Sequence, residues 1–289
     1  MYPKINKTVL MSGADYFNDE FAINSYMGDS EPVNTERAVA EHTAIREALE
    51  SSGVKVVCVP APAGCQDGVY TANWALVRGN VAVMASLPNK RKDEEPYAEQ
   101  VLRANGKTIV KIPEGMKFSG QGDALPVGNY LFTGSNYRTD LDVHEFLAEA
   151  LGYQVISLQT VPHYDDDGTP VINAVTGWPD SFFYDIDLAI SVLRDDLIAW
   201  CPEAFTPESQ ERIHAIEGIE KIEVSIEEAM QGFACNLVST GEVVVMSADA
   251  PNLKAAIEAH GLRTITPKIS ELAKGGGYIR CTTLTLDNT

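Results

Sequence analysis

The feature that most constrains the fold is a repeated order of predicted elements. A strand, a turn, a second strand, a helix and a third strand recur about every 50 to 60 residues, roughly five times. The clearest unit pairs strands 74–77 and 81–84 across Arg78-Gly79-Asn80, then continues with helix 94–104 and strand 108–112. Repetition at this period predicts a pseudo-symmetric α/β array rather than a doubly wound sheet.

The other predicted units follow the same order less completely. The first has strand 7–11, helix 35–51 with Thr35 as its candidate N-cap, and strand 54–59. The remaining strands are expected at 130–133, 154–158, 187–193, 197–200, 221–224, 234–238, 243–247 and 263–267, and the remaining helices at 143–151, 207–216 and 250–260. No low-complexity linker divides the chain, so we predict one domain over residues 1–289.

Composition narrows the class of partner. The formal net charge is −19 and 45% of the residues are hydrophobic, which argues against nucleic acid and anionic membrane surfaces as partners. No apolar run approaches the length of a membrane span. The five cysteines are scattered and lack CxxC spacing, so we expect a reducing, cytoplasmic location without disulfides. We also expect no metal and no cofactor.

A glycine-rich stretch near the C-terminus carries the first candidate for chemistry. Gly275-Gly276-Gly277 precedes Cys281, and an alternating Thr/Leu run that predicts a strand follows. The glycines permit a sharp turn or the close approach of another group. A cysteine held there is a candidate nucleophile, although most cysteines are simply small buried hydrophobes.

Seven short motifs occur in one order along nearly the whole chain. They are residues 21–24 with Met27 (similar to EINPWM), 66–73 (PDMVFTAN), Arg91 with Glu94 or Glu95 (R-x-x-E), 118–125 (FEGxGDAL), 137–140 (RTD/RTN), 183–187 (FYHLD) and 275–281 (GGGxxxC). Each motif alone is a weak signal, but seven in order are strong. On these residues the chain resembles the amidinotransferase and dimethylarginine dimethylaminohydrolase-like proteins of the pentein superfamily.

The resemblance implies a five-fold α/β propeller with its site in a central channel. It also implies chemistry on guanidino compounds through a covalent thiouronium intermediate. A guanidinium carbon is a poor electrophile and the group stays protonated well above pH 7. Carboxylates must therefore hold the cation while a thiolate attacks it.

The resemblance also suggests a role for each matching residue. Cys281 would be the nucleophile, and Asp123 and Asp187 the carboxylates around the guanidinium. Substrate binding would involve Asp67 at the α-ammonium, Arg91 and Arg138 at the α-carboxylate, Asn73, Asn24 and Ser119. The alternatives that stay open are surface ion pairs for the arginines, turn caps for Asp67 and Asn73, and a closed turn for Asp123.

Two positions depart from the family pattern. Asp185 stands where the family has its acid/base histidine, and Ser119 where it has a guanidinium-binding glutamate. An aspartate with its usual pKa of about 3.9 is a poor acid at pH 7. It would serve only if burial or the neighbouring Asp187 and Asp123 raised that pKa.

Three interpretations of these departures remain. The site acts on a different substrate, another histidine replaces the missing one, or the protein binds a ligand without catalysis. His163, in a polar loop, is the best replacement candidate, while the others are expected on solvated helix faces: His42, His144, His214 and His260.

The sequence thus predicts a cysteine-dependent hydrolase that acts on the C–N bond of an arginine-like guanidino or ureido compound. Hydrolysis is preferred to transfer because nothing visible specifies a second amine site. The alternatives are a catalytically silent pentein that binds an arginine-like ligand or a partner, and an amidinotransferase. A homodimer is expected at the level of the fold only.

Overall fold

The computed structural model describes residues 3–21, 31–135, 137–174, 177 and 179–289. Within these ranges the fold is mixed α/β. The strands are β1 (Thr8–Ser12), β2 (Lys55–Val59), β3 (Ala75–Arg78), β4 (Val81–Met84), β5 (Thr108–Lys111), β6 (Ala124–Val127), β7 (Tyr130–Ser135), β8 (Gln154–Gln159), β9 (Ile190–Arg194), β10 (Leu197–Trp200), β11 (Glu220–Glu223), β12 (Val238–Ser239), β13 (Val243–Val245), β14 (Arg263–Ile265) and β15 (Leu284–Thr285). The helices are α1 (Thr35–Ser51), α2 (Glu95–Ala104), α3 (Val143–Leu151), α4 (Pro207–His214), α5 (Ile226–Gln231) and α6 (Pro251–Ala259).

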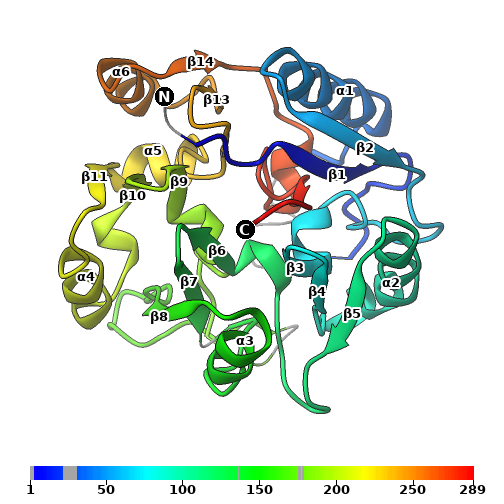
Figure 1. Cartoon of the computed structure of the whole chain (residues 1–289), viewed down its shortest axis with the longest axis horizontal. Coiled ribbons are helices and arrows are strands. Elements are labelled where there is room, and N and C mark those ends of the chain that lie inside the picture. The colour runs from blue at the N-terminus through cyan, green and yellow to red at the C-terminus, as the bar shows by residue number, and fades with distance from the viewer. Residues whose placement is uncertain (1–2, 22–30, 136, 175–176, 178) are drawn as a thin grey trace.

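These strands form five three-stranded sheets with one common plan. In each sheet the middle strand pairs antiparallel with one neighbour and parallel with the other, as β4 does with β3 and β5. A helix connects the two parallel strands, as a parallel pair requires. The five units follow one another around the centre of the view, with α1, α2, α3, α4 and α6 at the periphery (Figure 1). The predicted repeat is therefore confirmed.

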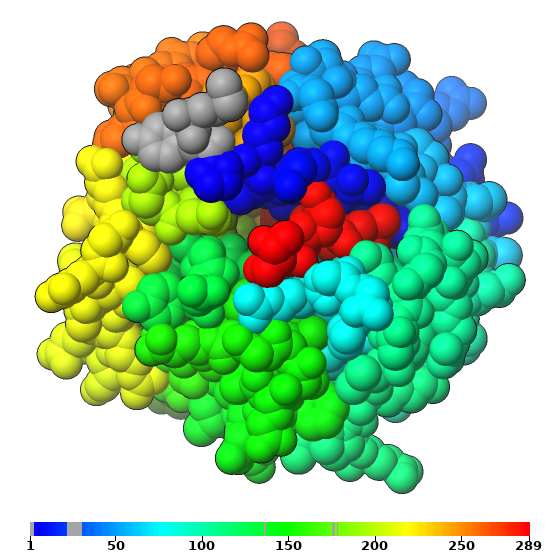
Figure 2. Space-filling model, viewed as in Figure 1, coloured from blue at the N-terminus to red at the C-terminus, as the bar shows by residue number. Residues whose placement is uncertain are grey.

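One sheet joins distant parts of the chain. Its middle strand β1 pairs in parallel with β2 and antiparallel with β15, with Val9 opposite Thr285 and Leu10 opposite Leu284. The red C-terminal segment accordingly lies beside the dark blue N-terminal strand near the centre of the molecule (Figure 2). This pairing fixes the segment that follows Cys281.

The buried core lies mainly between each helix and the sheets that it covers. In one cluster Ala98 and Leu102 of α2 pack against Val77 and Ala82 of the neighbouring strands. In another, Leu147 of α3 packs with residues of its own sheet and of the preceding unit. Because neighbouring units share these clusters, the burial of apolar area stabilises the units together.

Most predicted boundaries are confirmed to within one or two residues, and the differences have local causes. The sequence missed β6 and α5, and the predicted strand 234–238 is reduced to β12. Residues before β12 instead form turns, with Asn236 N donating to Phe233 O and Leu237 N to Cys235 O. Asp187 lies in a 3-10 turn (Ile186–Leu188) ahead of β9 rather than in the strand. The N-cap of α1 is Asn34, whose side chain accepts from Arg37 N, and not Thr35.

Two kinds of feature are absent from the described residues. None of their helices is long and apolar enough to cross a membrane. Nor do three or more of their His, Cys, Asp or Glu side chains gather in a group that could hold a metal ion.

Candidate active site

The glycine-rich segment before Cys281 is closely packed against an aromatic ring. A 3-10 turn (Leu272–Gly275) ends at Gly276, whose φ of +84° is in the left-handed region. A Cβ added to Gly275 would lie 2.2 Å from the Tyr70 hydroxyl oxygen, and one added to Gly277 would lie 2.6 Å from a carbon of the same ring. The predicted close approach is therefore confirmed, and Tyr70 is the group that approaches.

Cys281 is buried, with 3% of its surface exposed. Its thiol donates to Asp187 Oδ2 over 3.4 Å, and Asn236 Nδ2 donates to the sulfur over 3.2 Å. The backbone N of Cys281 donates to Asn236 Oδ1 over 3.1 Å. Asn236 therefore holds both the main chain and the sulfur of the candidate nucleophile, which faces a carboxylate.

Burial and negative charge keep this thiol protonated in the ligand-free protein. Burial raises the pKa of Cys281 well above its usual value, and the charge of Asp187 raises it further. Burial and then the charge of Asp185 raise the pKa of Asp187 to about 8, against the opposing effect of Arg280. A thiolate here requires positive charge to arrive in the site.

Two further predicted carboxylates, Asp123 and Asp67, are also buried. Asp123 Oδ1 accepts from Ile186 N over 3.0 Å, so the carboxylate contacts a distant segment rather than only closing its own turn. Burial and then the charge of Asp185 raise the pKa of Asp123 well above its usual value. Burial raises the pKa of Asp67 to about 6, with Arg91 opposing the shift.

The two positions that depart from the family pattern meet at one amide. Asn73 Nδ2 lies 2.8 Å from Asp185 Oδ2 and 3.0 Å from Ser119 Oγ. The adjacent Gly122 leaves room for this contact, since a Cβ there would lie 2.5 Å from Asn73 Nδ2. Asp185, Ser119 and Asn73 thus form one hydrogen-bonded cluster, which we call the Asp185 cluster.

The two predicted arginines are both buried, so neither forms a surface ion pair. Arg91 donates from Nε and Nη2 to the Glu94 carboxylate over 2.9 and 3.0 Å, and from Nη1 to Asn73 Oδ1 over 2.7 Å. Arg138 lies 3.7 Å from Asp185 Oδ2 and stacks over the Tyr184 ring. Each arginine therefore contacts a member of the Asp185 cluster, and their binding of a substrate carboxylate stays a prediction.

Three buried carboxylate oxygens of the predicted site residues have no hydrogen-bond partner in the described part of the chain. They are Asp67 Oδ1, Asp185 Oδ1 and Asp187 Oδ1. Buried acceptors are normally satisfied, so such atoms ask for an N–H or O–H donor from a ligand. A cation rich in N–H groups would supply both the donors and the missing positive charge.

A cavity of about 530 Å³ is lined by Asp67 and Arg91, whereas Cys281, Asp185 and Asp187 do not line it. Its other lining residues include Phe21, Cys65 and Lys90, and the Lys90 ammonium lies 3.1 Å from the centre of the Phe21 ring. The predicted ligand Asn24 lies outside the described residues. A small molecule in this cavity would therefore contact at least two predicted site residues.

The histidines differ from the sequence-based interpretation in two cases. His163 is exposed on its loop. His144, expected on a solvated face of its helix, is buried, and its ring nitrogens lie 2.7 Å from Ser157 Oγ and 2.8 Å from Gly134 O. The prediction for His144 was wrong because this face of α3 packs onto the neighbouring strands. His42, also expected on a solvated helix face, has a buried Nε2, and burial lowers its pKa to about 4.

Two residues near the thiol were not singled out from the sequence. Asn236 precedes a short strand and carries no motif, so no local signal marks it. Arg280 is buried beside Cys281, and its charge acts on Asp187. Arg280 could have been recognised from the sequence, because it is a charged residue directly before the candidate nucleophile.

The buried thiol, the acidic pocket and the five sheets define the class to which the comparisons point. Residues 14–287 match the family model described as "N,N dimethylarginine dimethylhydrolase, eukaryotic". The dimethylarginine dimethylaminohydrolase of Mycobacterium tuberculosis is 30% identical over 95% of this chain and 84% of its own length. The chain belongs to the dimethylarginine dimethylaminohydrolase family, as the seven motifs predicted.

Longer relatives are also similar. The bifunctional arginine dihydrolase/ornithine cyclodeaminase AgrE of Nostoc is 29% identical over 95% of this chain, but the chain spans only 37% of the length of AgrE. The solved N-terminal domain of the cyanobacterial arginine dihydrolase ArgZ, bound to product, superposes with a TM-score of 0.87 at 28% identity, covering 97% of each chain. A variant of that domain was solved covalently bonded to a reaction intermediate.

Proposed function

We propose that the chain is a cysteine-dependent hydrolase that cleaves a C–N bond of an arginine-like guanidino or ureido compound through a covalent Cys281 adduct. The observation that carries this proposal is the contact of Cys281 Sγ with Asp187 Oδ2 beside unpartnered buried carboxylate oxygens. Family membership and the covalently bonded ArgZ variant support it.

The substrate cation completes the site electrostatically. A guanidinium between Asp187 and Asp123 would donate to Asp187 Oδ1, which now lacks a partner, and would add positive charge near the sulfur. That charge lowers the pKa of both Cys281 and Asp187, which burial and like charge have raised. The thiol is therefore activated when the substrate is bound.

Asp187 then carries the proton through the reaction. Sγ forms a bond to the guanidinium carbon as the thiol proton passes to Asp187 Oδ2. The C–N bond breaks and the departing amine takes up that proton. Water next adds to the thiouronium carbon, loses a proton to Asp187, and the C–S bond breaks to give the ureido product and the free thiol.

This route uses Asp187 where the family relies on a histidine. Asp187 has a pKa of about 8 and lies in contact with the sulfur, whereas Asp185 accepts a hydrogen bond from Asn73 and lies 3.7 Å from Arg138. In this proposal Asp185 tunes its neighbours by charge, and Arg91 orients Asn73. Arg138 and Asp67 bind the remote amino-acid end of the substrate.

A catalytically silent protein that binds an arginine-like ligand is the second candidate. The observation that favours it is the Asp185 cluster, since the family's acid/base position is occupied by a carboxylate engaged with Asn73 and close to Arg138. An amidinotransferase would need a second amine in the place of water.

The scaffold of this proposal is a single pentein domain over residues 1–289. We propose that its five units form a five-fold propeller whose central channel holds the site. The common plan of the sheets and the superposition on the ArgZ domain support this arrangement. A homodimer is proposed on the fold alone, and light scattering would test it.

The test is mass spectrometry and product analysis with arginine, methylarginines, agmatine, citrulline and short guanidino acids. It compares the native chain with Cys281→Ala and Asp185→His, and with Cys58→Ala as a matched control at an exposed thiol. We expect turnover or an adduct that Cys281→Ala loses and Cys58→Ala keeps.

Other outcomes lead to the alternatives. If the native chain is inert but binds arginine, and Asp185→His gains activity, the silent binder is correct. If an adduct forms and is released only by an added amine, the protein is a transferase. If no compound binds or reacts with any variant, the proposed function is wrong.

A further inference from the structure

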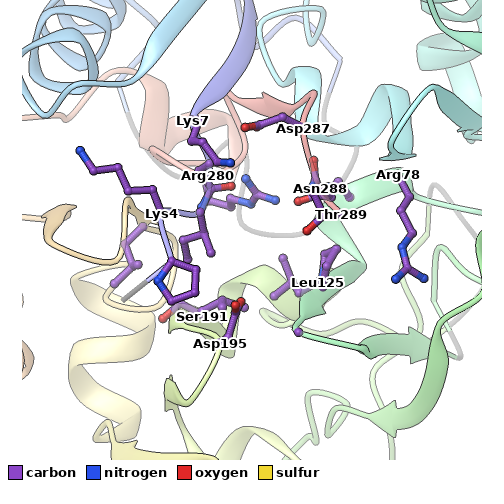
Figure 3. Close-up of a pocket in the computed structure, with 18 of the residues that line it drawn as sticks. Lys4, Lys7, Arg78, Leu125, Ser191, Asp195, Arg280, Asp287, Asn288 and Thr289 are labelled. Atoms are coloured by element: carbon purple, nitrogen blue, oxygen red, sulfur yellow. The ribbon is translucent and has the colours of Figure 1, made fainter. Parts of the chain in front are cut away.

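A second cavity lies on the other side of the Arg280–Cys281 peptide from the thiol's contacts. It has a volume of about 480 Å³ and shares no lining residue with the cavity at Asp67 and Arg91. Arg280 lies near its centre, between the N-terminal strand and the C-terminal residues (Figure 3). Nothing in the proposed reaction uses this space.

The floor of the cavity holds the buried guanidinium of Arg280, which makes few hydrogen bonds. Arg280 is 6% exposed and donates from Nη1 to Thr285 Oγ1 over 3.0 Å. No carboxylate forms an ion pair with it in the described part of the chain, although buried charges are normally paired. Burial lowers the pKa of Arg280 to about 10, so it stays charged at neutral pH.

A second buried donor without a partner lies beside it. Gln121 is fully buried and lines the same cavity, and its Nε2 has no hydrogen-bond partner among the described residues. The amide orientation is fixed, because Gln121 Oε1 accepts from the backbone N of Thr285 over 2.9 Å. Gln121 and Arg280 are thus both anchored to Thr285 and both present free N–H groups.

The other residues that line the cavity indicate which kind of ligand these donors would bind. Leu125, Ile190 and Leu237 supply an apolar wall. The other charges are of both signs: Lys4, Lys7 and Asp195 are exposed, and Arg78 and Asp287 are half-buried. The selectivity for an anion therefore comes from the floor, where Arg280 and Gln121 Nε2 both offer N–H donors.

We propose that this cavity binds a small organic carboxylate, with its carboxylate on Arg280 and Gln121 and a short apolar body against Leu125, Ile190 and Leu237. The guanidinium fork matches a planar carboxylate. The amide adds one more N–H, and the ligand would satisfy both buried donors at once.

The test is titration of the protein with hexanoate, followed by calorimetry and by the side-chain amide signal of Gln121 in ¹⁵N-resolved NMR. Hexanamide and hexylammonium serve as neutral and cationic controls of the same length. The variants are Arg280→Met, Gln121→Leu and, as a matched control at a rim charge, Lys4→Gln.

We expect hexanoate to bind, to shift the Gln121 amide signal, and to outcompete hexanamide by at least tenfold. Arg280→Met should weaken hexanoate binding by more than tenfold and Gln121→Leu by a few-fold, while Lys4→Gln leaves it within twofold. If Arg280→Met does not fold, Gln121→Leu still decides. Equal binding of hexanoate and hexanamide, an unmoved Gln121 signal, or a loss in Lys4→Gln as large as in Gln121→Leu would overturn the proposal.

Discussion

Arg280 and Cys281 are consecutive residues that face opposite chemical surroundings. On the side of Cys281 buried carboxylate oxygens lack donors, and on the side of Arg280 the buried Gln121 Nε2 lacks an acceptor and Arg280 itself has one hydrogen bond. The first side is suited to a cation and the second to an anion. The difference shows that the short segment around Arg280 and Cys281 separates a site suited to a cation from a site suited to an anion.

Removing the Asp187 carboxylate from the Cys281 side should have the largest effect on ligand binding. In Asp187→Asn the affinity for arginine should fall by about a hundredfold, because a buried charged partner of the guanidinium is lost. The Cys281 thiol should at the same time react faster with iodoacetamide at pH 9, where the native Asp187 is ionised, since the charge that raises the pKa of the thiol is gone. Calorimetry and alkylation rates measure the two effects.

The exposed Asp195→Asn is the matched control and should leave both quantities unchanged. A slower alkylation of Asp187→Asn would contradict the electrostatic account of the thiol.

The pH dependence of the free energy of unfolding should distinguish the carboxylates on the Cys281 side from Arg280. The folded pKa values of Asp187 (about 8) and Asp67 (about 6) lie above their usual value of 3.8. Folding therefore retains protons, and this contribution to stability is complete below pH 4 and is lost as the pH rises towards 8. Each group changes the free energy of unfolding by at most about 1.4 kcal/mol per pH unit. Arg280, with a pKa of about 10, adds no slope in this range.

Urea unfolding between pH 5 and 8 checks this sign. The native chain should lose more stability over the range than Asp187→Asn. Arg280→Met should steepen the loss near pH 8, because the charge that opposes the raised pKa of Asp187 is gone. Parallel profiles for the native chain and Asp187→Asn would show that the Asp187 carboxyl does not carry a raised pKa.

The smallest expected effect couples the two sides. An anion on Arg280 would offset the positive charge that now opposes a cation beside Asp187. Hexanoate should therefore raise the affinity for arginine a few-fold, and arginine should raise the affinity for hexanoate by the same factor. Calorimetry of each ligand in the presence of the other tests this prediction, and independent binding would limit the anion site to a separate role.

The sequence predicted what local patterns encode. Alternating apolar runs and turns marked nearly every strand and helix, and three glycines before a cysteine marked a close approach that Tyr70 fulfils. These signals lie within a few neighbouring residues, so they can be recognised without the fold. The resemblance to the family, rather than a local pattern, marked Asp185 and Ser119 as unusual.

The contacts between distant residues could not be predicted in the same way. Asn73 joins Ser119 and Asp185, which are 46 and 112 positions away. Asn236 reaches the sulfur from 45 positions away, and Gln121 reaches Thr285 across 164. No spacing rule relates such residues, because their contact depends on how the five units come together.

The pairing of β1 with β15 sets the time at which the thiol acquires its special surroundings. β1 is synthesised before β15 and cannot pair with it until the far end of the chain has been made. Such long-range contacts slow folding. Until that strand docks, Cys281 is an ordinary exposed thiol open to oxidation. Completion of the fold then protects it, because burial beside Asp187 favours the unreactive protonated form. Burial of this segment in the folded protein thus also protects the residue proposed to carry out the reaction from oxidation.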